Sequence, residues 1–407
     1  MIPKRIEWAF QNTYLQNTFS SKADTRKFIT CLELLLVLVY GLVKIFELFL
    51  IQKTTHTKSI LDIDHLVIES AAPHMHLNYF RHFGLKKTNK NYLIIECYNK
   101  NQFTTIHKIG YFQILKEFTL SFKETISIFN ILESKQTDKD LFRVIRTGLP
   151  VFAYLSCLFK HFKLANPQIK FFSGGAHLAA AAAISSGIES HWLTHGLIEK
   201  ALTLNRKSWD ACAENHYISY PGFDCIYLYS NEEAEYLKKY KVAGELIVYP
   251  YKKVDVQSGK IIIFSESTHS SSERKVLKKI INLFQQYNYQ IVMKLHPSYK
   301  GDLDKNILKE FTLTVIRGLE KTALELITIE KPEFAFAFAS TALCEALHTG
   351  VIPICIEEKN RQTEGCAYPH RKRSIRWSEN QDLVTKFLQN PNVESRNSIL
   401  HNLLSAK

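Results

Sequence analysis

The sequence predicts an α/β protein in which two parallel-sheet domains follow an N-terminal hydrophobic helix. The chain has 407 residues, which is more than one compact core usually holds and suits two domains plus an appendage. Short apolar runs with β-branched residues alternate with segments of helical periodicity, which is typical of repeated strand–helix units. One such run, Gln290–Lys294, leads directly into polar residues. Ligands bind just outside the carboxyl ends of strands in open parallel sheets.

The composition favours a folded protein with anionic partners. Hydrophobic residues make up 46% of the chain and charged residues 22%, which excludes a disordered chain. Lys and Arg number 52 against 39 Asp and Glu, and the net charge of +13 favours phosphates, acidic sugars, anionic lipid or nucleic acid. We expect no nucleic-acid partner, because no helix-turn-helix, zinc-knuckle or RNP-type motif is visible.

The cysteines indicate a reducing compartment. They show neither CxxC spacing nor a regular interval, and most lie in apolar runs, so we interpret them as reduced core residues of a cytosolic protein. The eight are Cys31, Cys97, Cys157, Cys212, Cys225, Cys344, Cys355 and Cys366.

Residues 1–55 form a basic segment followed by an apolar helix expected over Phe28–Ile51. A helix of this length spans about 36 Å, which is enough to cross a bilayer. Glu33, Lys44 and Glu47 fall within about 60° of one another and form one narrow polar stripe. The segment is therefore a helix in the membrane interface, a core helix, or a membrane span. A span would place each of these charges in hydrocarbon, at a cost of about 2.5–3.5 kcal/mol per residue.

The first domain is expected over residues 56–248. Its predicted strands are His65–Ser70, Tyr92–Tyr98, Pro167–Phe172, Ser190–Thr194 and Phe223–Tyr229. Helical spacing covers Phe122–Glu133, Lys139–Phe162 with a break at Gly148-Leu149-Pro150, Ala176–Ser186 and Asn231–Tyr240. The turn Ser173-Gly174-Gly175 is a weak phosphate-loop signal, and ordinary turn chemistry is the favoured interpretation.

The second domain is expected over residues 249–407, after a hinge that begins at Val248-Tyr249-Pro250. Its predicted strands are Lys260–Phe264, Gln290–Lys294, Phe311–Ile316, Phe334–Phe338 and Ile352–Ile356. A hydroxyl-rich loop, Ser265–Ser272, follows the first of these strands. The helices Ser271–Tyr287, Ala342–His348, Asp382–Leu388 and Val393–Leu404 complete the domain.

Two stretches of the second domain predict a phosphate site. Lys294, His296 and Pro297 follow one strand, so a cation and an imidazole lie at its carboxyl end. Ser340 and Thr341 separate another strand from a helix, and hydroxyls at a helix N-terminus bind anions. Each stretch alone is also explained by ordinary α/β connections. Together, in one domain, they indicate a pocket for the phosphate of a nucleotide.

Lys-x-His-Pro, followed by a strand–Ser–Thr–helix–Glu segment, resembles the nucleotide-binding half of GT-B glycosyltransferases that use CMP-activated acidic sugars. These are the bacterial sialyltransferases, the polysialyltransferases and the Kdo transferases of capsule and lipopolysaccharide synthesis. The resemblance covers about residues 165–356. It implies two Rossmann-like domains that face each other across a cleft, with the His-Pro pair and the Ser-Thr pair on the CMP phosphate. It also implies a ribose-binding role for Glu325 and a place for His195-Gly196 in the cleft.

Each candidate side chain has an ordinary alternative. His296 contacts or protonates the leaving phosphate, or caps the strand end. Lys294 neutralises nucleotide charge, or is a solvated lysine. Glu345 faces the ribose, or is a solvated helix acid. His195 accepts the proton of the acceptor hydroxyl, or is a loop or core histidine. Arg371 and Arg373 bind an anionic acceptor or lipid together with Lys372 and Arg376, or belong to a solvated basic loop.

The chain departs from the sialyltransferases at the catalytic base. Those enzymes pair an acidic residue with a glycine in the first domain, where this chain has Ser173-Gly174-Gly175. The spacing singles out none of the remaining carboxylates, which are Glu69, Glu189, Glu199 and Asp224. No metal is expected, because His191 and His195 would lie about 13 Å apart along one strand.

The sequence therefore predicts a glycosyltransferase that moves a CMP-activated ulosonic acid, Kdo or a sialic-type sugar, to a hydroxyl of a surface glycan. Its partners would be the nucleotide sugar, a glycan or glycolipid acceptor and a membrane surface, at the cytoplasmic face of the bacterial inner membrane. No cofactor is expected. Alternatives are a UDP- or GDP-sugar donor, a CDP-alcohol donor, or a non-catalytic polysaccharide scaffold.

Overall fold

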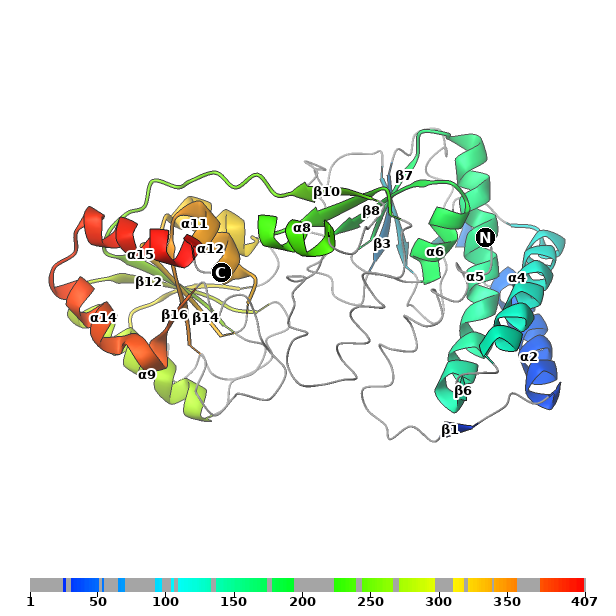
Figure 1. The fold of residues 1–407 in the computed structure, drawn as a ribbon, viewed down its shortest axis with the longest axis horizontal. Coiled ribbons are helices and arrows are strands. Elements are labelled where there is room, and N and C mark those ends of the chain that lie inside the picture. The colour runs from blue at the N-terminus through cyan, green and yellow to red at the C-terminus, as the bar shows by residue number, and fades with distance from the viewer. Residues whose placement is uncertain are drawn as a thin grey trace. The chain divides into compact units, whose positions relative to one another are not determined.

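The computed structural model describes the helices, the strands and some of the connections of the 407-residue chain. The described residues are 25–26, 31–50, 53–54, 65–69, 92–96, 104–105, 109–132, 137–173, 178–193, 223–238, 244–265, 271–296, 310–317, 321–338, 340–356 and 374–405. They contain two six-stranded sheets, each flanked by helices (Figure 1). This confirms the predicted fold class of two Rossmann-like α/β domains.

The first sheet has the strand order β10–β9–β8–β7–β3–β4. Neighbouring strands from β4 to β9 pair in parallel. The bounds are β3 His65–Glu69, β4 Tyr92–Glu96, β7 Lys170–Ser173, β8 Glu189–Leu193, β9 Cys225–Leu228 and β10 Glu245–Val248. The strand β10 was not predicted from the sequence. It lies beside β9 at the edge of the sheet, where Glu245 N donates a hydrogen bond to Asp224 O at 2.8 Å.

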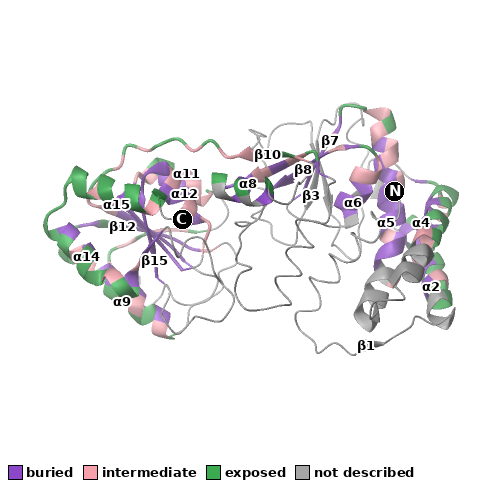
Figure 2. Ribbon diagram, viewed as in Figure 1, coloured by how far each residue is buried: buried purple, intermediate pink, exposed green. Residues whose placement is uncertain are grey.

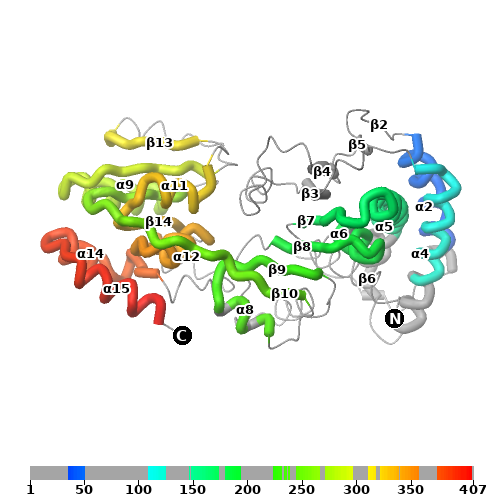
Figure 3. Tube along the Cα trace, turned by 90° about the horizontal axis from the view of Figure 1, so that it is seen from above, coloured from blue at the N-terminus to red at the C-terminus, as the bar shows by residue number. Residues whose placement is uncertain are grey.

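A layer of helices packs beside this sheet. The helices α5 (Lys139–Ala165) and α6 (Leu178–Ser185) are in contact, and α4 (Tyr111–Leu132) packs on α5 (Figure 3). The predicted break at Gly148-Leu149-Pro150 is wrong, because α5 continues through Pro150. An internal proline costs a helix about 3 kcal/mol. Burial of residues such as Phe152 and Phe159 on the same helix offsets that cost.

The apolar N-terminal segment forms α2, Cys31–Leu50, which packs on α4 and α5. Its buried side is lined by Val37, Ile45 and Leu48, and Gly41 lies so close to Phe118 that a Cβ would be 2.1 Å from the ring Cζ. The opposite side of α2 is exposed (Figure 2). Among the described residues, no helix combines the length and apolar composition that a bilayer crossing requires.

The second sheet has the order β13–β12–β11–β14–β15–β16, and every pair is parallel. Counted along the chain, this is the doubly wound order 3-2-1-4-5-6. The bounds are β11 Lys260–Phe264, β12 Gln290–Lys294, β13 Thr314–Ile316, β14 Phe334–Ala337, β15 Ile352–Cys355 and β16 Ile375–Arg376. The strand β16 was not predicted, because residues 370–376 were interpreted as a basic loop.

Alternation along β14 gives this sheet two different faces. Phe334 and Phe336 lie in the cluster with Phe284 of α9 (Ser271–Gln286), whereas Ala335 and Ala337 lie in the cluster with residues of α11 (Ala323–Glu330) and α12 (Ala342–Thr349). Successive strand residues point to opposite faces. The small alanines let α11 and α12 approach the sheet closely. The helices α14 (Trp377–Gln389) and α15 (Val393–Ser405) complete the layer on the phenylalanine side.

The chain divides into two compact units, one around each sheet. The chain passes finally from the first unit to the second between Ile247 and Val248. The second unit also contains the first part of α8, Asn231–Lys238, up to Tyr236.

Candidate functional site

The predicted phosphate residues that the structure describes follow the carboxyl ends of β12 and β14 in the second sheet. Strands β12 and β14 flank β11, so their backbones are about 10 Å apart, two strand spacings. Ser265, directly after β11, donates its backbone N–H to Lys294 O at 2.9 Å, and its Oγ accepts from His296 N at 3.2 Å. The backbone at His296 is therefore held to the end of the neighbouring strand.

Lys294 is the last residue of β12 and is only 6% exposed. The alternative of a solvated lysine is therefore wrong. A buried ammonium is costly unless polar or anionic groups surround it. This position gives the sheet edge a positive charge with little water around it, which strengthens its interaction with an anion.

The helix α12 begins beside the end of β14. Ser340 Oγ accepts from Ala342 N at 3.3 Å, so one hydroxyl already satisfies a first-turn donor. Thr341 stands at the N-cap position and makes no side-chain capping hydrogen bond. The Thr341 hydroxyl is thus not used by the helix. Together with the positive end of the helix dipole, this is an arrangement that suits an anion.

Glu345 lies in the first turn of α12 and is 8% exposed, so it is not a solvated helix acid. Burial raises the pKa of its carboxyl to about 8, and a hydrogen bond with the Leu324 backbone partly opposes this shift. Within the described residues, Glu345 Oε2 has no hydrogen-bond partner. At neutral pH the group is largely a neutral carboxylic acid, which can donate or accept a hydrogen bond without adding negative charge.

Two tyrosines near Glu345, Tyr249 and Tyr251, were not predicted as site residues from the sequence. Tyr251 stacks on His348 with ring centroids 5.0 Å apart and an interplanar angle of 12°. Its hydroxyl has no hydrogen-bond partner within the described residues, and burial followed by the charge of Glu345 raises its pKa. The pKa of Tyr249 is also raised, first by burial and then by Glu345 and Glu325. Glu345 is therefore buried at α12 beside two partly buried tyrosines.

Glu325 has a structural task in addition to its predicted ribose contact. It forms a capping box with Thr322, whose N–H donates to Glu325 Oε2 at 2.8 Å and whose hydroxyl does so at 3.3 Å. The box fixes the start of α11. His195, Pro297, Arg371 and Arg373 lie outside the described residues, so their predicted roles stay predictions.

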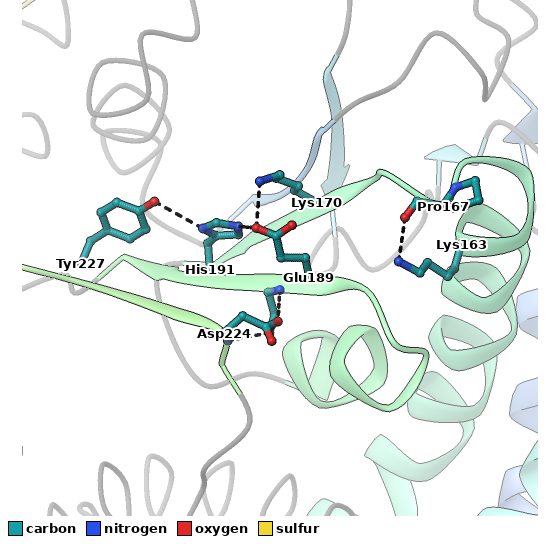
Figure 4. A network of polar contacts seen from close by, with 8 residues as sticks. Lys163, Pro167, Lys170, Glu189, His191, Asp224 and Tyr227 are labelled. Carbon is teal, nitrogen blue, oxygen red and sulfur yellow. Dashed lines mark hydrogen bonds and ion pairs between the residues drawn. The ribbon is translucent and has the colours of Figure 1, made fainter. Parts of the chain in front are cut away.

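The first unit holds a polar network on one face of its sheet (Figure 4). Glu189 Oε1 accepts from Lys170 Nζ at 2.8 Å and lies 2.9 Å from His191 Nε2. The Tyr227 hydroxyl is 3.3 Å from His191 Nδ1. Burial is the largest cause that lowers the pKa of His191, and the Lys170 hydrogen bond is the largest that lowers the pKa of Glu189.

Two of the carboxylates that remained candidates for the catalytic base, Asp224 and Glu189, bind neighbouring residues in the first unit. Asp224 Oδ2 accepts from Ser190 N at 2.7 Å and from Ser190 Oγ at 3.1 Å, so this carboxylate holds β8 to the start of β9. Glu189 is engaged with Lys170 and His191. Of the four carboxylates left open by the sequence, these two therefore have structural partners.

The fold consists of two parallel-sheet α/β domains, and the candidate site is the polar carboxyl edge of the second sheet. No protein-family model and no curated protein matches the chain. Among solved structures, the chain is similar to the glycosyltransferase of kitacinnamycin, at 10% identity and a TM-score of 0.41 over 84% of this chain and 96% of that one.

Two further solved structures are similar to the chain. The MnaA–UDP co-structure from S. aureus matches at 11% identity and a TM-score of 0.44, covering 85% of this chain and 91% of that one. The UDP-GlcNAc 2-epimerase from Neisseria meningitidis bound to UDP-GlcNAc matches at 12% identity and 0.45, covering 83% and 95%. Since these TM-scores lie below 0.5, we base the function on the site residues and not on these likenesses.

Proposed function

We propose that the protein is a GT-B-type glycosyltransferase that transfers a CMP-activated ulosonic acid to a glycan hydroxyl. The observation that carries this proposal is the buried Lys294 beside His296, at the sheet edge from which α12 also begins. A cation, an imidazole and a helix N-terminus are the groups that stabilise a leaving phosphate. Glu345 adds a buried neutral carboxyl in the first turn of α12, which supports a ribose contact without repelling the phosphate.

Each residue then has a role in one displacement. The bond between the anomeric carbon and the phosphate oxygen breaks, and a bond from the acceptor oxygen to that carbon forms. Lys294, His296, Ser340 and Thr341 bind the phosphate as its charge develops, and Glu345 and Glu325 bind the ribose. His195 accepts the proton of the acceptor hydroxyl. Because CMP carries a single phosphate, we propose that these side chains stabilise it without a metal or cofactor.

Nucleotide binding tests the site directly. Thermal unfolding of the full chain is measured with CMP, CDP, UDP and GDP. We expect CMP to raise the midpoint most, and His296→Ala and Thr341→Val to reduce that shift. His401→Ala, at an exposed position on α15, is the matched control and should keep it. Stabilisation by UDP or GDP alone would overturn the CMP donor, and no stabilisation by any nucleotide would overturn the site.

Product mass decides the chemistry. Incubation with CMP-Kdo or a CMP-sialic-type sugar and a glycan acceptor should yield a product heavier by one ulosonic acid residue, with release of CMP. Addition of an alcohol phosphate from a CDP-alcohol donor would instead identify a polymer-phosphate transferase. Nucleotide binding without turnover of any donor would favour a scaffold.

We also propose that the exposed side of α2 docks on an anionic membrane surface and keeps the enzyme near a lipid-linked acceptor. The large apolar side chains exposed on α2 and α4 are Leu35, Leu36, Val39, Leu42, Val43, Phe46, Phe49, Leu50, Phe112 and Leu120. Lys116 and Lys123 are exposed on α4 within one turn of Leu120. An apolar face with nearby lysines suits an interface in which side chains enter the headgroup region.

Vesicle co-sedimentation tests this docking. The full chain should sediment with phosphatidylglycerol vesicles and much less with phosphatidylcholine vesicles. The double variant Val43→Glu/Phe46→Glu should reduce binding about tenfold or more. The control Val393→Glu places the same charge at another exposed apolar position, 68% exposed on α15, and should bind as wild type. Equal sedimentation of the double variant and wild type would contradict the proposal.

A further inference from the structure

Three possible metal-ligating side chains converge on the first sheet at a place unrelated to the proposed nucleotide site. Glu189, His191 and Cys225 each offer a ligand atom, and these atoms all lie within 4.8 Å of one another. Glu189 and His191 are two residues apart on β8 and so point to the same face. Cys225 on β9 stands directly opposite His191 in the strand register.

We propose that Glu189, His191 and Cys225 bind one zinc ion. A thiolate, an imidazole and a carboxylate form a ligand set for a borderline-soft divalent ion, whereas Mg²⁺ and Ca²⁺ prefer oxygen ligands alone. Tetrahedral zinc with ligand bonds of about 2.0–2.3 Å separates its ligand atoms by about 3.5 Å. The three atoms therefore need shifts of about 1 Å, which side-chain rotations provide.

The surroundings of His191 fit a ligand. The residue is only 4% exposed, and the neutral form of its ring is the one that binds metal. The Tyr227 hydroxyl lies next to Nδ1, at 3.3 Å, and can either donate or accept a hydrogen bond. With zinc on Nε2, the Nδ1–H donates to Tyr227. Such a partner fixes the orientation of a metal-bound imidazole.

Cys225 supplies the thiolate. It is a free, partly buried cysteine. Zinc binding releases the thiol proton to solvent as the Zn–S bond forms. The metal provides the charge that makes this favourable.

Lys170 is the competitor for this site. It forms an ion pair with Glu189, and both side chains are about two-fifths exposed. Exposed ion pairs are worth about 0–1 kcal/mol, so a zinc ion can displace the ammonium at small cost. Removal of Lys170 should therefore tighten zinc binding, because it frees the carboxylate and removes a nearby positive charge.

The position of the cluster indicates a structural ion. Glu189 begins β8, so the cluster starts at the amino end of this strand, whereas ligands of open parallel sheets bind at carboxyl ends. Zinc would cross-link β8 to β9. A zinc ion here is independent of the proposed glycosyl transfer, and its test uses direct binding.

Cobalt substitution of the full chain is the test. One equivalent of Co²⁺ should give a thiolate charge-transfer band and the intense visible bands of a tetrahedral site, and Zn²⁺ should remove them. Cys225→Ser and Glu189→Gln keep side-chain shape, and each should weaken Zn²⁺ binding about tenfold or more in competition with a chelator. Lys170→Met should tighten it several-fold. Cys157→Ser, at a partly buried thiol on α5, and His401→Ala are controls that should bind as wild type.

The proposal has clear contrary outcomes. Absence of the thiolate band at one equivalent would overturn it. So would a Cys225→Ser variant that binds Zn²⁺ as tightly as the Cys157→Ser control, since the other histidines would then explain the binding. Unchanged affinity in Glu189→Gln would show that Glu189 is not a ligand and would also overturn the three-residue site. Circular dichroism of each variant confirms that it is folded.

Discussion

The two sheets of the protein use their polar side chains in different places. In the second sheet the strands are apolar along their length, and polar groups such as Lys294 and Ser265 come where strands end. In the first sheet, Lys170 and Glu189 begin β7 and β8, His191 and Tyr227 lie within β8 and β9, and their side chains contact one another across the strands. Groups at the carboxyl ends of parallel strands can reach a ligand outside the sheet, whereas the groups of this network mainly reach their neighbours. The first arrangement therefore favours binding and the second favours holding strands together.

A pair of substitutions, one in each unit, tests this difference between a binding residue and a packing residue. His296→Ala should lower the transfer rate about 10²–10⁴-fold and leave the unfolding midpoint nearly unchanged, because it is the backbone N–H of His296 that bonds Ser265. Phe171→Leu, in the core contact with Phe159 at 5.5 Å, should cost about 1–2 kcal/mol of unfolding free energy and leave the rate of the folded enzyme unchanged. Rate and unfolding measurements on both variants check this. A large stability loss in His296→Ala would remove the distinction.

The pH dependence of stability tests whether Glu345 of the second unit is protonated in the folded protein. The pKa of Glu345 is raised from 4.5 to about 8 in the folded protein, so the folded state holds a proton that the unfolded state releases. Its contribution to stability is therefore complete below pH 4.5 and is lost as the pH rises to 8, by on the order of a few kcal/mol.

Glu345→Gln removes this titration. Compared with wild type, the variant should lose less stability between pH 5 and pH 8 and be the more stable protein at pH 8. Urea unfolding at a series of pH values measures the difference. Parallel pH profiles for the two proteins would mean that the Glu345 carboxyl is ionised in the folded state.

The smallest expected effect concerns the packing of α2 in the first unit. An alanine at position 41 would place its Cβ 2.1 Å from Phe118 Cζ, and the buried ring has little room to move. Gly41→Ala should therefore destabilise the protein by about 1–2 kcal/mol, although alanine alone favours a helix by up to about 1 kcal/mol. Val43→Ala, on the exposed side of the same helix, should change stability by less than about 0.5 kcal/mol. A stabilised Gly41→Ala protein would show that α2 is not held against α4.

The same difference explains how much of the molecule the sequence could predict. Strand–helix alternation predicted the parallel architecture, and the strand ends at Lys294 and Ser340 could be found because their polar residues follow apolar runs directly. The proposed zinc ligands could not be found from the sequence, because Cys225 lies opposite His191 only through the strand register, 34 residues along the chain. Continuity of α5 through Pro150 was missed because tertiary packing outweighs a local helix-breaking preference.

The borders of the second sheet limit its pairing with other chains. Its outermost described strands are very short, three residues in β13 and two in β16. A short outer strand offers few unpaired backbone groups to a neighbouring chain, which limits aggregation by strand addition. Pairing between the second sheets of neighbouring copies is therefore limited at both of these borders.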